Sequence, residues 1–353
     1  MARNERGGSR AGSSGQEDVE AGPQPTRDSS SRDSSWTPLM HAAADGDIEA
    51  VKKHLLEDKG KKNSDGDTAL IIAARAKHKD IVELLDPTDK DGVTALMRAA
   101  DRNDLPTARA LAPLQRGQKA SGNVKIGEVT IDKGGTALMM AAARGHAKIV
   151  ELLVGCEGGA RVGGWSALVF AARSGCSGIR LNDPLVDHPR CVELLVEYES
   201  NISGWTELIH AAYRGDISAA RNNLRMKGRR DASGWTALMY AAARGHERIV
   251  ELLREESGIQ NNTGQTALMW AARNGHPECV RLLLEKESEM RNTKGWTALM
   301  NAVWGGHIEC VKLLLGEREL RTVYDYCDYP RHTTALDIAE KKGHKEIVDI
   351  LSS

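Results

Sequence analysis

Apolar and polar residues follow a pattern that repeats about every thirty residues. The copy that begins at Thr236 reads TALMYAAARGHERIVELL, and closely similar copies begin at Thr266 and Thr297. Counting from the Thr, a Leu at +2 and an Ala pair at +5 and +6 share one face of a short helix. After a Gly at +9, apolar residues at +13, +14, +16 and +17 predict a second helix with one buried face. Such a period is typical of a solenoid, in which each unit packs on its neighbours.

Ten copies can be aligned, which predicts an all-α solenoid of ten helix-turn-helix units over residues 36–353. Their anchor residues are Thr37, Thr68, Thr94, Thr136, Ser166, Thr206, Thr236, Thr266, Thr297 and Thr334. The anchor is expected to cap its helix, because a Thr hydroxyl can accept the free N–H groups of the first turn. Residues 1–35 are rich in Ser, Gly and Arg and poor in large aliphatic residues, so we predict a disordered tail.

Three connections depart from the pattern. Asp86 and Pro87 are expected to end the second helix of the Thr68 unit early. In the long connection that precedes Thr136, residues 124–131 can form a small hairpin. An insertion, residues 176–187, separates the two helices of a single unit. Inserted loops are either simply tolerated or carry specificity, and the sequence leaves both open.

The Thr206 unit is the weakest internal copy. It holds Asn222 and Asn223 where neighbouring units bury two Leu. The lost packing, on the order of 2 kcal/mol, predicts a hinge, with faster hydrogen exchange over residues 206–230 than over residues 236–260. A basic cluster follows, which is either a solvated loop or a site for an acidic partner. It consists of Arg225, Lys227, Arg229 and Arg230.

The repeated unit resembles the ankyrin repeat, a turn and two antiparallel helices around a T-P-L-H-x-A core. Residues 36–43, WTPLMHAA, come nearest to that core, and pairs such as Gly245-His246 resemble the turn between its helices. Met or another apolar residue mostly replaces the His of the core, and the usual hairpin sequence is missing. The units are also similar to ankyrin-only proteins of parasitic protists, some of whose relatives are fused to a kinase domain. No kinase motif occurs in these 353 residues.

The resemblance implies where a partner binds. In ankyrin proteins the residue before the Thr and the exposed side of the first helix line a concave groove. Aromatic residues at these places are candidate interface anchors, and they are Trp165, Trp205, Trp235, Tyr240, Trp270 and Trp296. The alternative is that each Trp seals its turn against the next unit. The +4 position lies about 200° around the helix from the buried Leu, so Tyr240 and Trp270 are expected to be exposed. Replacing both with Ala is then expected to abolish partner binding and to leave thermal stability nearly unchanged.

Candidate chemistry is sparse. His-x-x-Cys occurs as His188/Cys191, His276/Cys279 and His307/Cys310, a spacing that raises the question of zinc. Sister units place Ile149, Ile249 or Ile347 where the Cys stands, so we expect each sulfur to replace a core aliphatic group. The sequence has no nucleophile elbow, phosphate-binding loop or kinase motif. We therefore expect no enzyme activity, no cofactor and no metal.

Charge and hydropathy narrow the class of partner. The chain has 48 basic and 49 acidic residues and a pI of about 6.8, which gives no global field for nucleic acid or an anionic membrane. No apolar run of about eighteen residues and no signal peptide is present, so we expect a cytoplasmic location, with the nucleus also open.

The predicted function is a monomeric, non-enzymatic scaffold that binds a partner protein along its concave face. The alternatives are an adaptor that presents a client to a kinase or ubiquitin ligase, and an inhibitor whose 176–187 loop blocks a partner's active site.

Overall fold

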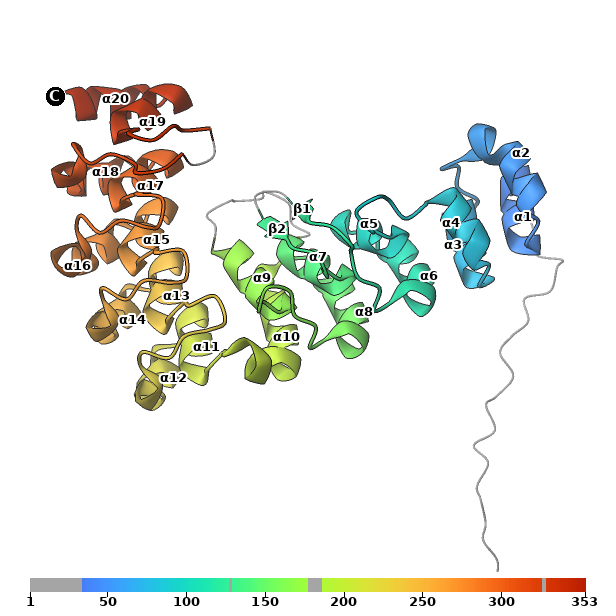
Figure 1. The fold of residues 1–353 in the computed structure, drawn as a ribbon. Coiled ribbons are helices and arrows are strands. Elements are labelled where there is room, and N and C mark those ends of the chain that lie inside the picture. The colour runs from blue at the N-terminus through green and yellow to red at the C-terminus, as the bar shows by residue number, and fades with distance from the viewer. Residues whose placement is uncertain (1–33, 127–128, 177–185, 326–327) are drawn as a thin grey trace, which may run out of the picture.

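A computed structural model describes residues 34–126, 129–176, 186–325 and 328–353. Within these residues the chain consists of helix pairs stacked side by side, with one two-stranded hairpin (Figure 1). The prediction of an all-α solenoid of about ten units is confirmed for this part of the chain. The predicted tail, residues 1–35, and the insertion, residues 176–187, lie almost wholly outside the described residues.

Each unit contributes a first and a second helix. The first helices are α1 (Pro38–Asp45), α3 (Ala69–Arg75), α5 (Ala95–Asp101), α7 (Ala137–Arg144), α9 (Ala167–Gly175), α11 (Glu207–Arg214), α13 (Ala237–Arg244), α15 (Ala267–Asn274), α17 (Ala298–Gly305) and α19 (Ala335–Lys342). The second helices are α2 (Ile48–Asp58), α4 (Lys79–Leu85), α6 (Leu105–Gln115), α8 (Ala147–Glu157), α10 (His188–Ser203), α12 (Ile217–Asn222), α14 (Glu247–Leu252), α16 (Pro277–Glu287), α18 (Ile308–Leu313) and α20 (Lys345–Ser352). The 3-10 turns η2 (Leu224–Met226), η3 (Arg254–Glu256) and η4 (Leu315–Glu317) follow α12, α14 and α18. Among the helices of the described residues, none combines the length and the apolar character needed to cross a membrane.

Two of the predicted irregularities are confirmed. Strands β1 (Val124–Ile126) and β2 (Val129–Ile131) pair antiparallel, with Val124 opposite Ile131. Helix α4 ends at Leu85, and Asp86 caps it with a φ of −143°, outside the helical region. The early end follows from Pro87, which disfavours helical geometry in the residue before it. Helix α3 packs against α6 of the following unit.

The first helices begin at the predicted caps. In nine units the anchor Thr accepts the backbone N–H three residues on, as Thr236 does from Met239 at 3.4 Å. Ser166 is the exception, since its side chain makes no cap hydrogen bond among the described residues. A cap of this kind stabilises a helix by about 1 kcal/mol.

A His contacts the end of the preceding first helix, usually beside a Gly, at most junctions between units. Gly245 ends α13 with a φ of 74°, and a Cβ at this position would lie 2.6 Å from Nδ1 of His276. Glycine therefore meets two requirements, the left-handed backbone and the close approach of the ring. His276 Nε2 lies 3.1 Å from the carbonyl oxygen of Ala243, so this nitrogen carries the hydrogen and donates it. Equivalent contacts join His78 to Ala43, His146 to Ala100, His188 to Ala143, His246 to Tyr213 and His307 to Arg273.

An Asp or Asn five residues before the anchor organises the loop that leads into many units. Asp231 Oδ1 accepts the backbone N–H groups of Ser233 and Trp235, both at 2.9 Å. Such Asx turns offer the backbone a local partner where no helix is available. The same arrangement is made by Asn63, Asp89, Asn261 and Asn292.

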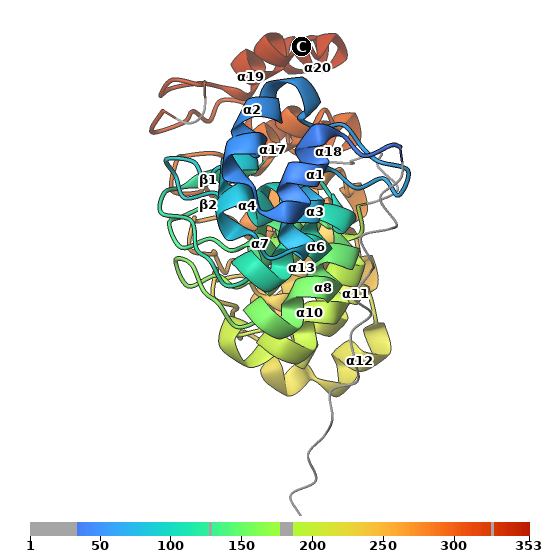
Figure 2. The same ribbon diagram turned by 90° about the vertical axis from the view of Figure 1, so that its right-hand side faces the viewer.

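The array bends between its fifth and sixth units. Helix α10 has 16 residues and continues to Ser203, so that only residues 204–206 separate it from α11. In the described part of the chain α9 packs against α7 and α10, whereas α11 packs against α13. Figure 1 shows one arm from α1 to α10 and a second from α11 to α20, which meet near α10 and α12. In Figure 2, α1 faces the viewer, and α19 and α20 lie at the top.

Candidate partner-binding surface

Five of the six aromatic residues predicted to anchor a partner are buried. The exposed fractions are 0% for Trp235, 0% for Tyr240, 2% for Trp296, 5% for Trp205 and 8% for Trp270, while Trp165 is half-buried. The expectation that Tyr240 and Trp270 are exposed was therefore wrong. A side chain without accessible surface can be contacted by a partner only after the core around it opens.

The cause lies at the start of each first helix. Trp235 stands immediately before the cap Thr236, and Tyr240 is the fourth residue of the helix that follows. Apolar residues at these two positions pack on each other as a hydrophobic staple. The ring centroids of Trp235 and Tyr240 are 4.7 Å apart, and the corresponding pairs Trp165–Phe170 and Trp36–His41 are each 5.4 Å apart. The Trp before the Thr therefore covers the +4 side chain.

Aromatic side chains of successive units form a continuous stack beside the bend. Trp235 lies 4.4 Å from Trp270 of the next unit, and Tyr240 lies 5.0 Å from Trp205 of the preceding unit, between ring centroids. Tyr213 packs edge-on against Trp205 at 5.9 Å and against Tyr240 at 6.1 Å. Edge-to-face and offset arrangements are the favourable ones for aromatic pairs. The stack thus ties together three units of the second arm.

A buried carboxyl group holds Tyr240, a ring in the middle of this stack. The Tyr240 hydroxyl donates to Oδ2 of Asp231 at 2.7 Å, and the Ser233 hydroxyl donates to Oδ1 at 2.7 Å. Burial raises the pKa of Asp231, while the hydrogen bonds from Tyr240 and Ser233 oppose that rise. Burial, with the nearby Asp231, also raises the pKa of Tyr240 well above its usual value. The hydrogen bond satisfies the one polar atom that Tyr240 brings into the core.

A row of arginine side chains remains accessible at the ends of the first helices. Its members stand seven or eight residues after the anchor and are Arg75, Arg144, Arg173, Arg214, Arg244 and Arg273, which we call the arginine row. Arg173 lies 4.1 Å from the ring centroid of Trp165, and Arg244 lies 4.3 Å from that of Tyr213. Cation–π contacts of this kind hold a guanidinium over a ring while its edge stays in water. The arginine row is half-buried to exposed, so it is polar surface within reach of a partner.

The two arms touch each other beside the arginine row. The side-chain amide of Asn274, at the end of α15, donates to the carbonyl oxygens of Cys176 and Ala243, both at 2.6 Å. Arg173 of α9 also reaches the second arm, where it lies 5.7 Å from the ring centroid of Trp235. Beside the arginine row, part of the surface is therefore occupied by contacts of the chain with itself.

A carboxylate at the end of the second helix ties most units to their neighbours. Glu256 accepts the backbone N–H of Leu238 in its own unit and that of Gly228 in the preceding loop, both at 2.9 Å. The equivalent carboxylates are Glu157, Glu199, Glu287 and Glu317, and Asp58 and Gln115 make the first of the two contacts. Burial raises the pKa of Glu199 and Glu287, and the backbone donors oppose that rise. These carboxylates link the start of one unit to the loop of the unit before it.

The sixth unit replaces this carboxylate with Met226. Met226 is the last residue of η2, as Glu256 is of η3 and Glu317 is of η4. Beside it, between the end of α10 and the start of α11, lies a cleft of about 680 Å³, which we call the elbow cleft. Its lining includes Val196, Trp205, Glu207, His210, Arg225, Met226, Arg229 and Arg230.

A family model that spans three ankyrin repeats matches the chain at residues 20–91, 39–124, 96–181, 185–263, 208–293, 254–322 and 287–353. The chain belongs to the ankyrin repeat family. A search of the curated proteins gave no match. Because the matches overlap along the array, all ten helix pairs of the described residues lie within the ankyrin region. Ankyrin repeats are a protein–protein interaction module, and proteins built from them are typically not enzymes.

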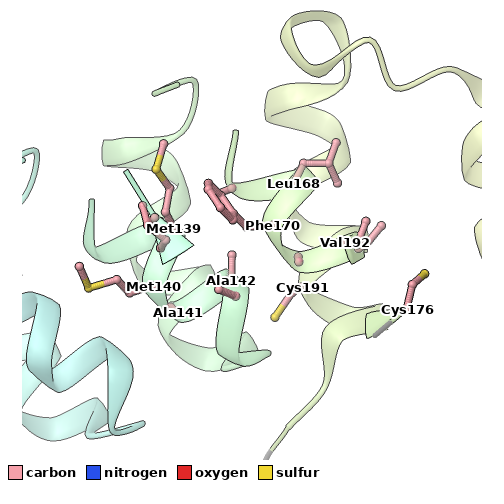
Figure 3. Close-up of a cluster of buried hydrophobic side chains, with 14 of the residues drawn as sticks. Met139, Met140, Ala141, Ala142, Leu168, Phe170, Cys176, Cys191 and Val192 are labelled. Carbon is pink, nitrogen blue, oxygen red and sulfur yellow. The ribbon is translucent and has the colours of Figure 1, made fainter. Parts of the chain in front are cut away.

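The cysteines of the His-x-x-Cys pairs pack inside this ankyrin core, as predicted. Cys191 and Cys279 are 0% exposed and Cys310 is 1% exposed. Figure 3 shows Cys191 in the layer where α7 and α9 pack, close to Ala142 and Val192. Burial raises the pKa of Cys191 and Cys279 to about 12 and that of Cys310 to about 11, so the thiols hold their protons at neutral pH. In the described residues no three His, Cys, Asp or Glu side chains are grouped as a metal site would require.

Proposed function

We propose that this ankyrin protein is a monomeric, non-enzymatic scaffold of the cytoplasm that binds a partner protein along the arginine row and the loops beside it. The observation that supports the proposal is the different placement of the aromatic and the arginine side chains. The aromatic side chains pack against one another, whereas the arginines at the ends of the same helices stay half-buried to exposed. Three of them form ion pairs, Arg75 with Asp67, Arg144 with Asp101 and Arg214 with Glu193. Charged side chains that are half-buried to exposed can contact a partner protein, which supports the proposal.

Arginine suits that role for physical reasons. Its planar guanidinium can bind a carboxylate through two parallel hydrogen bonds, and it is less strongly hydrated than an ammonium group. Of the six predicted anchors, Trp165 keeps accessible surface and lies beneath Arg173. Trp165 and Arg173 together are therefore the proposed centre of the interface, and the other arginines form a polar rim that sets the register.

The test is affinity capture of partners from extract of the native cells, with the full chain as bait and mass spectrometry as readout. A variant with Arg144→Glu and Arg273→Glu reverses two charges of the arginine row. A control with Arg248→Glu and Arg281→Glu changes the net charge equally on exposed positions of the second helices α14 and α16. We expect the wild type and the control to capture the same proteins, and the arginine-row variant to lose them. Identical capture by both variants, or no specific capture by the wild type, would contradict the proposal.

A further inference from the structure

The elbow cleft carries a positive charge that its own residues do not neutralise. Arg225, Arg229 and Arg230 line it and are exposed, and Glu207 is the one acidic residue in its lining. Arg230 donates to the carbonyl oxygen of Gln260 at 3.2 Å. Within the described residues neither Arg225 nor Arg229 makes an ion pair. The neighbouring Lys227 differs, since its ammonium group lies 2.5 Å from a carboxylate oxygen of Glu255.

The cleft also stands where the other units place a carboxylate. In the seventh unit, Oε2 of Glu256 accepts the backbone N–H of Leu238 at 2.9 Å. In the sixth unit Met226 takes the place of Glu256, and Leu208 takes the place of Leu238. No side chain of the described residues accepts the N–H of Leu208. The first turn of α11 therefore keeps a donor that a carboxylate occupies elsewhere in the same array.

A second donor near the cleft is unused. Trp205 lines the cleft and is 5% exposed, and its indole N–H has no hydrogen-bond partner in the described part of the chain. The indole N–H groups of Trp235 and Trp270, outside the cleft, also lack a partner among the described residues, so what distinguishes Trp205 is its place in the cleft lining. Trp205, Val196 and Met226 also give the cleft an apolar part, against which the methylene groups of a Glu side chain can pack.

From these observations we propose that the elbow cleft binds an acidic peptide segment of the partner protein, with a Glu or Asp carboxylate held by Arg225 and Arg229. This inference rests on the scaffold function proposed above and names the chemistry of its partner. A peptide fits better than a nucleic acid, because the cleft is lined by three basic side chains only, on a chain of formal net charge −1. Binding to a phosphate backbone uses an extended track of basic contacts.

The first test measures binding of a fluorescein-labelled hexaglutamate peptide to the full chain by fluorescence anisotropy. The cleft variant carries Arg225→Ala and Arg229→Ala. The control carries Arg248→Ala and Arg321→Ala, which removes the same charge from exposed positions outside the cleft. We expect binding to weaken about tenfold or more in the cleft variant and to stay at the wild-type level in the control. A hexaglutamine peptide is expected not to bind.

Several results would overturn the inference. They are equal loss of binding in both variants, unchanged binding in the cleft variant, and a single-stranded oligonucleotide that binds through Arg225 and Arg229 when hexaglutamate does not. If the cleft variant still captures the wild-type partners from extract, the scaffold function stands and the acidic peptide site fails. If the wild type captures nothing, the scaffold function fails, whatever the peptide does.

Filling the cleft from within gives an independent test. Met226→Glu supplies the carboxylate that Glu256 and Glu317 supply in their own units. We expect this variant to keep or raise the thermal midpoint of the wild type and to bind hexaglutamate several-fold more weakly, because its own carboxylate takes the place of the peptide's. Full peptide binding by the Met226→Glu variant would show that this position is not part of the site.

Discussion

The rings of Trp235 and Tyr240 pack 4.7 Å apart between centroids, and neither side chain has any exposed surface. Both residues had been expected to face a partner. The two rings instead pack on each other at the start of α13. Tyr240 also contacts Trp205 of the preceding unit, and Trp235 contacts Trp270 of the next unit. The aromatic side chains therefore stabilise the array, and we expect the residues around them to contact the partner.

Removing the indole of Trp235 should destabilise the whole second arm. We expect Trp235→Ala to lower the free energy of unfolding by about 3 to 5 kcal/mol, the range for loss of a large buried aromatic side chain. Trp165→Ala should cost clearly less, because Trp165 is half-buried. Urea denaturation followed by circular dichroism compares the two. Equal losses, or a Trp235→Ala variant as stable as the wild type, would mean that the stack is not a main source of stability.

The buried carboxylates that link the units should contribute more to folding stability than exposed carboxylates on the same helix. Glu287 is 1% exposed and accepts the backbone N–H groups of Leu268 and Gly258 at 2.7 and 2.9 Å. Glu287→Ala leaves both donors without a partner, and we expect a loss of about 1 to 3 kcal/mol.

The matched control for Glu287 is Glu285, whose side chain is 80% exposed and pairs with Arg254. An exposed ion pair contributes about 1 kcal/mol or less, so Glu285→Ala should leave the thermal midpoint almost unchanged. Thermal denaturation of the Glu287→Ala and Glu285→Ala variants measures this difference. Similar midpoints for the two would refute a linking role for Glu287.

Stability should depend on pH through the buried histidines. His188 is 9% exposed, and its Nε2 lies 3.1 Å from the carbonyl oxygen of Ala143. Burial lowers the pKa of His188 below the reference value of 6.5, and the nearby charges of His146 and Arg244 lower it further, against the hydrogen bond to Ala143 and the charge of Asp187. In acid His188 therefore binds more protons in the unfolded chain than in the folded one. The stability from neutral His188 is present above its unfolded pKa and is lost as the pH falls through its folded pKa.

We therefore expect His188→Asn to reduce the fall in thermal midpoint between about pH 7.5 and about pH 5.5. An Asn amide can still donate to the Ala143 carbonyl but does not titrate. Buried Glu199, whose pKa is raised by burial, acts in the opposite sense and is common to both proteins. The control is His332→Asn, at an exposed position whose left-handed φ of 70° Asn tolerates. An equal fall in thermal midpoint in the His188→Asn variant and the wild type would show that His188 is not a source of this pH dependence.

The sixth unit should open more readily than the seventh. Of helix α12 only Ala220 is buried, whereas the seventh unit buries Ile249, Val250 and Leu253. Few buried apolar contacts favour local opening. We expect faster amide hydrogen exchange over residues 206–230 than over residues 236–260. Equal or slower exchange in the sixth unit would contradict the prediction of a hinge there.

Much of the fold follows from local signals in the sequence. Thr236 and its equivalents predicted the helix starts, because a Thr hydroxyl is a good cap acceptor. Gly245 and its equivalents predicted the helix ends, because few other residues adopt a positive φ. The core position of Cys191 followed from the Ile in sister units. These features depend on residues a few positions apart, and the repetition of the unit shows which of them recur.

The partner surface was less predictable, because it depends on contacts between units. A single-helix projection placed Tyr240 on the exposed side and took no account of Trp235, although a Trp before the cap is the signal for a hydrophobic staple. The buried carboxylates carried a signal too, a Glu twenty or twenty-one residues after the anchor, as in Glu256 and Glu287. The bend had no local signal, since α10 continues through Asn201, the position at which other units place an Asx turn.

The central claim is that a partner covers the ends of the first helices while the aromatic stack stays closed. Amide hydrogen exchange of the full chain, with and without the captured partner, tests it most directly. The account predicts slower exchange on binding over residues 173–176, 244–246 and 273–276, at the arginine row, with no change over residues 235–240. Slower exchange over residues 235–240 and none at the helix ends would mean that the partner inserts among the stacked rings, and the account would be wrong.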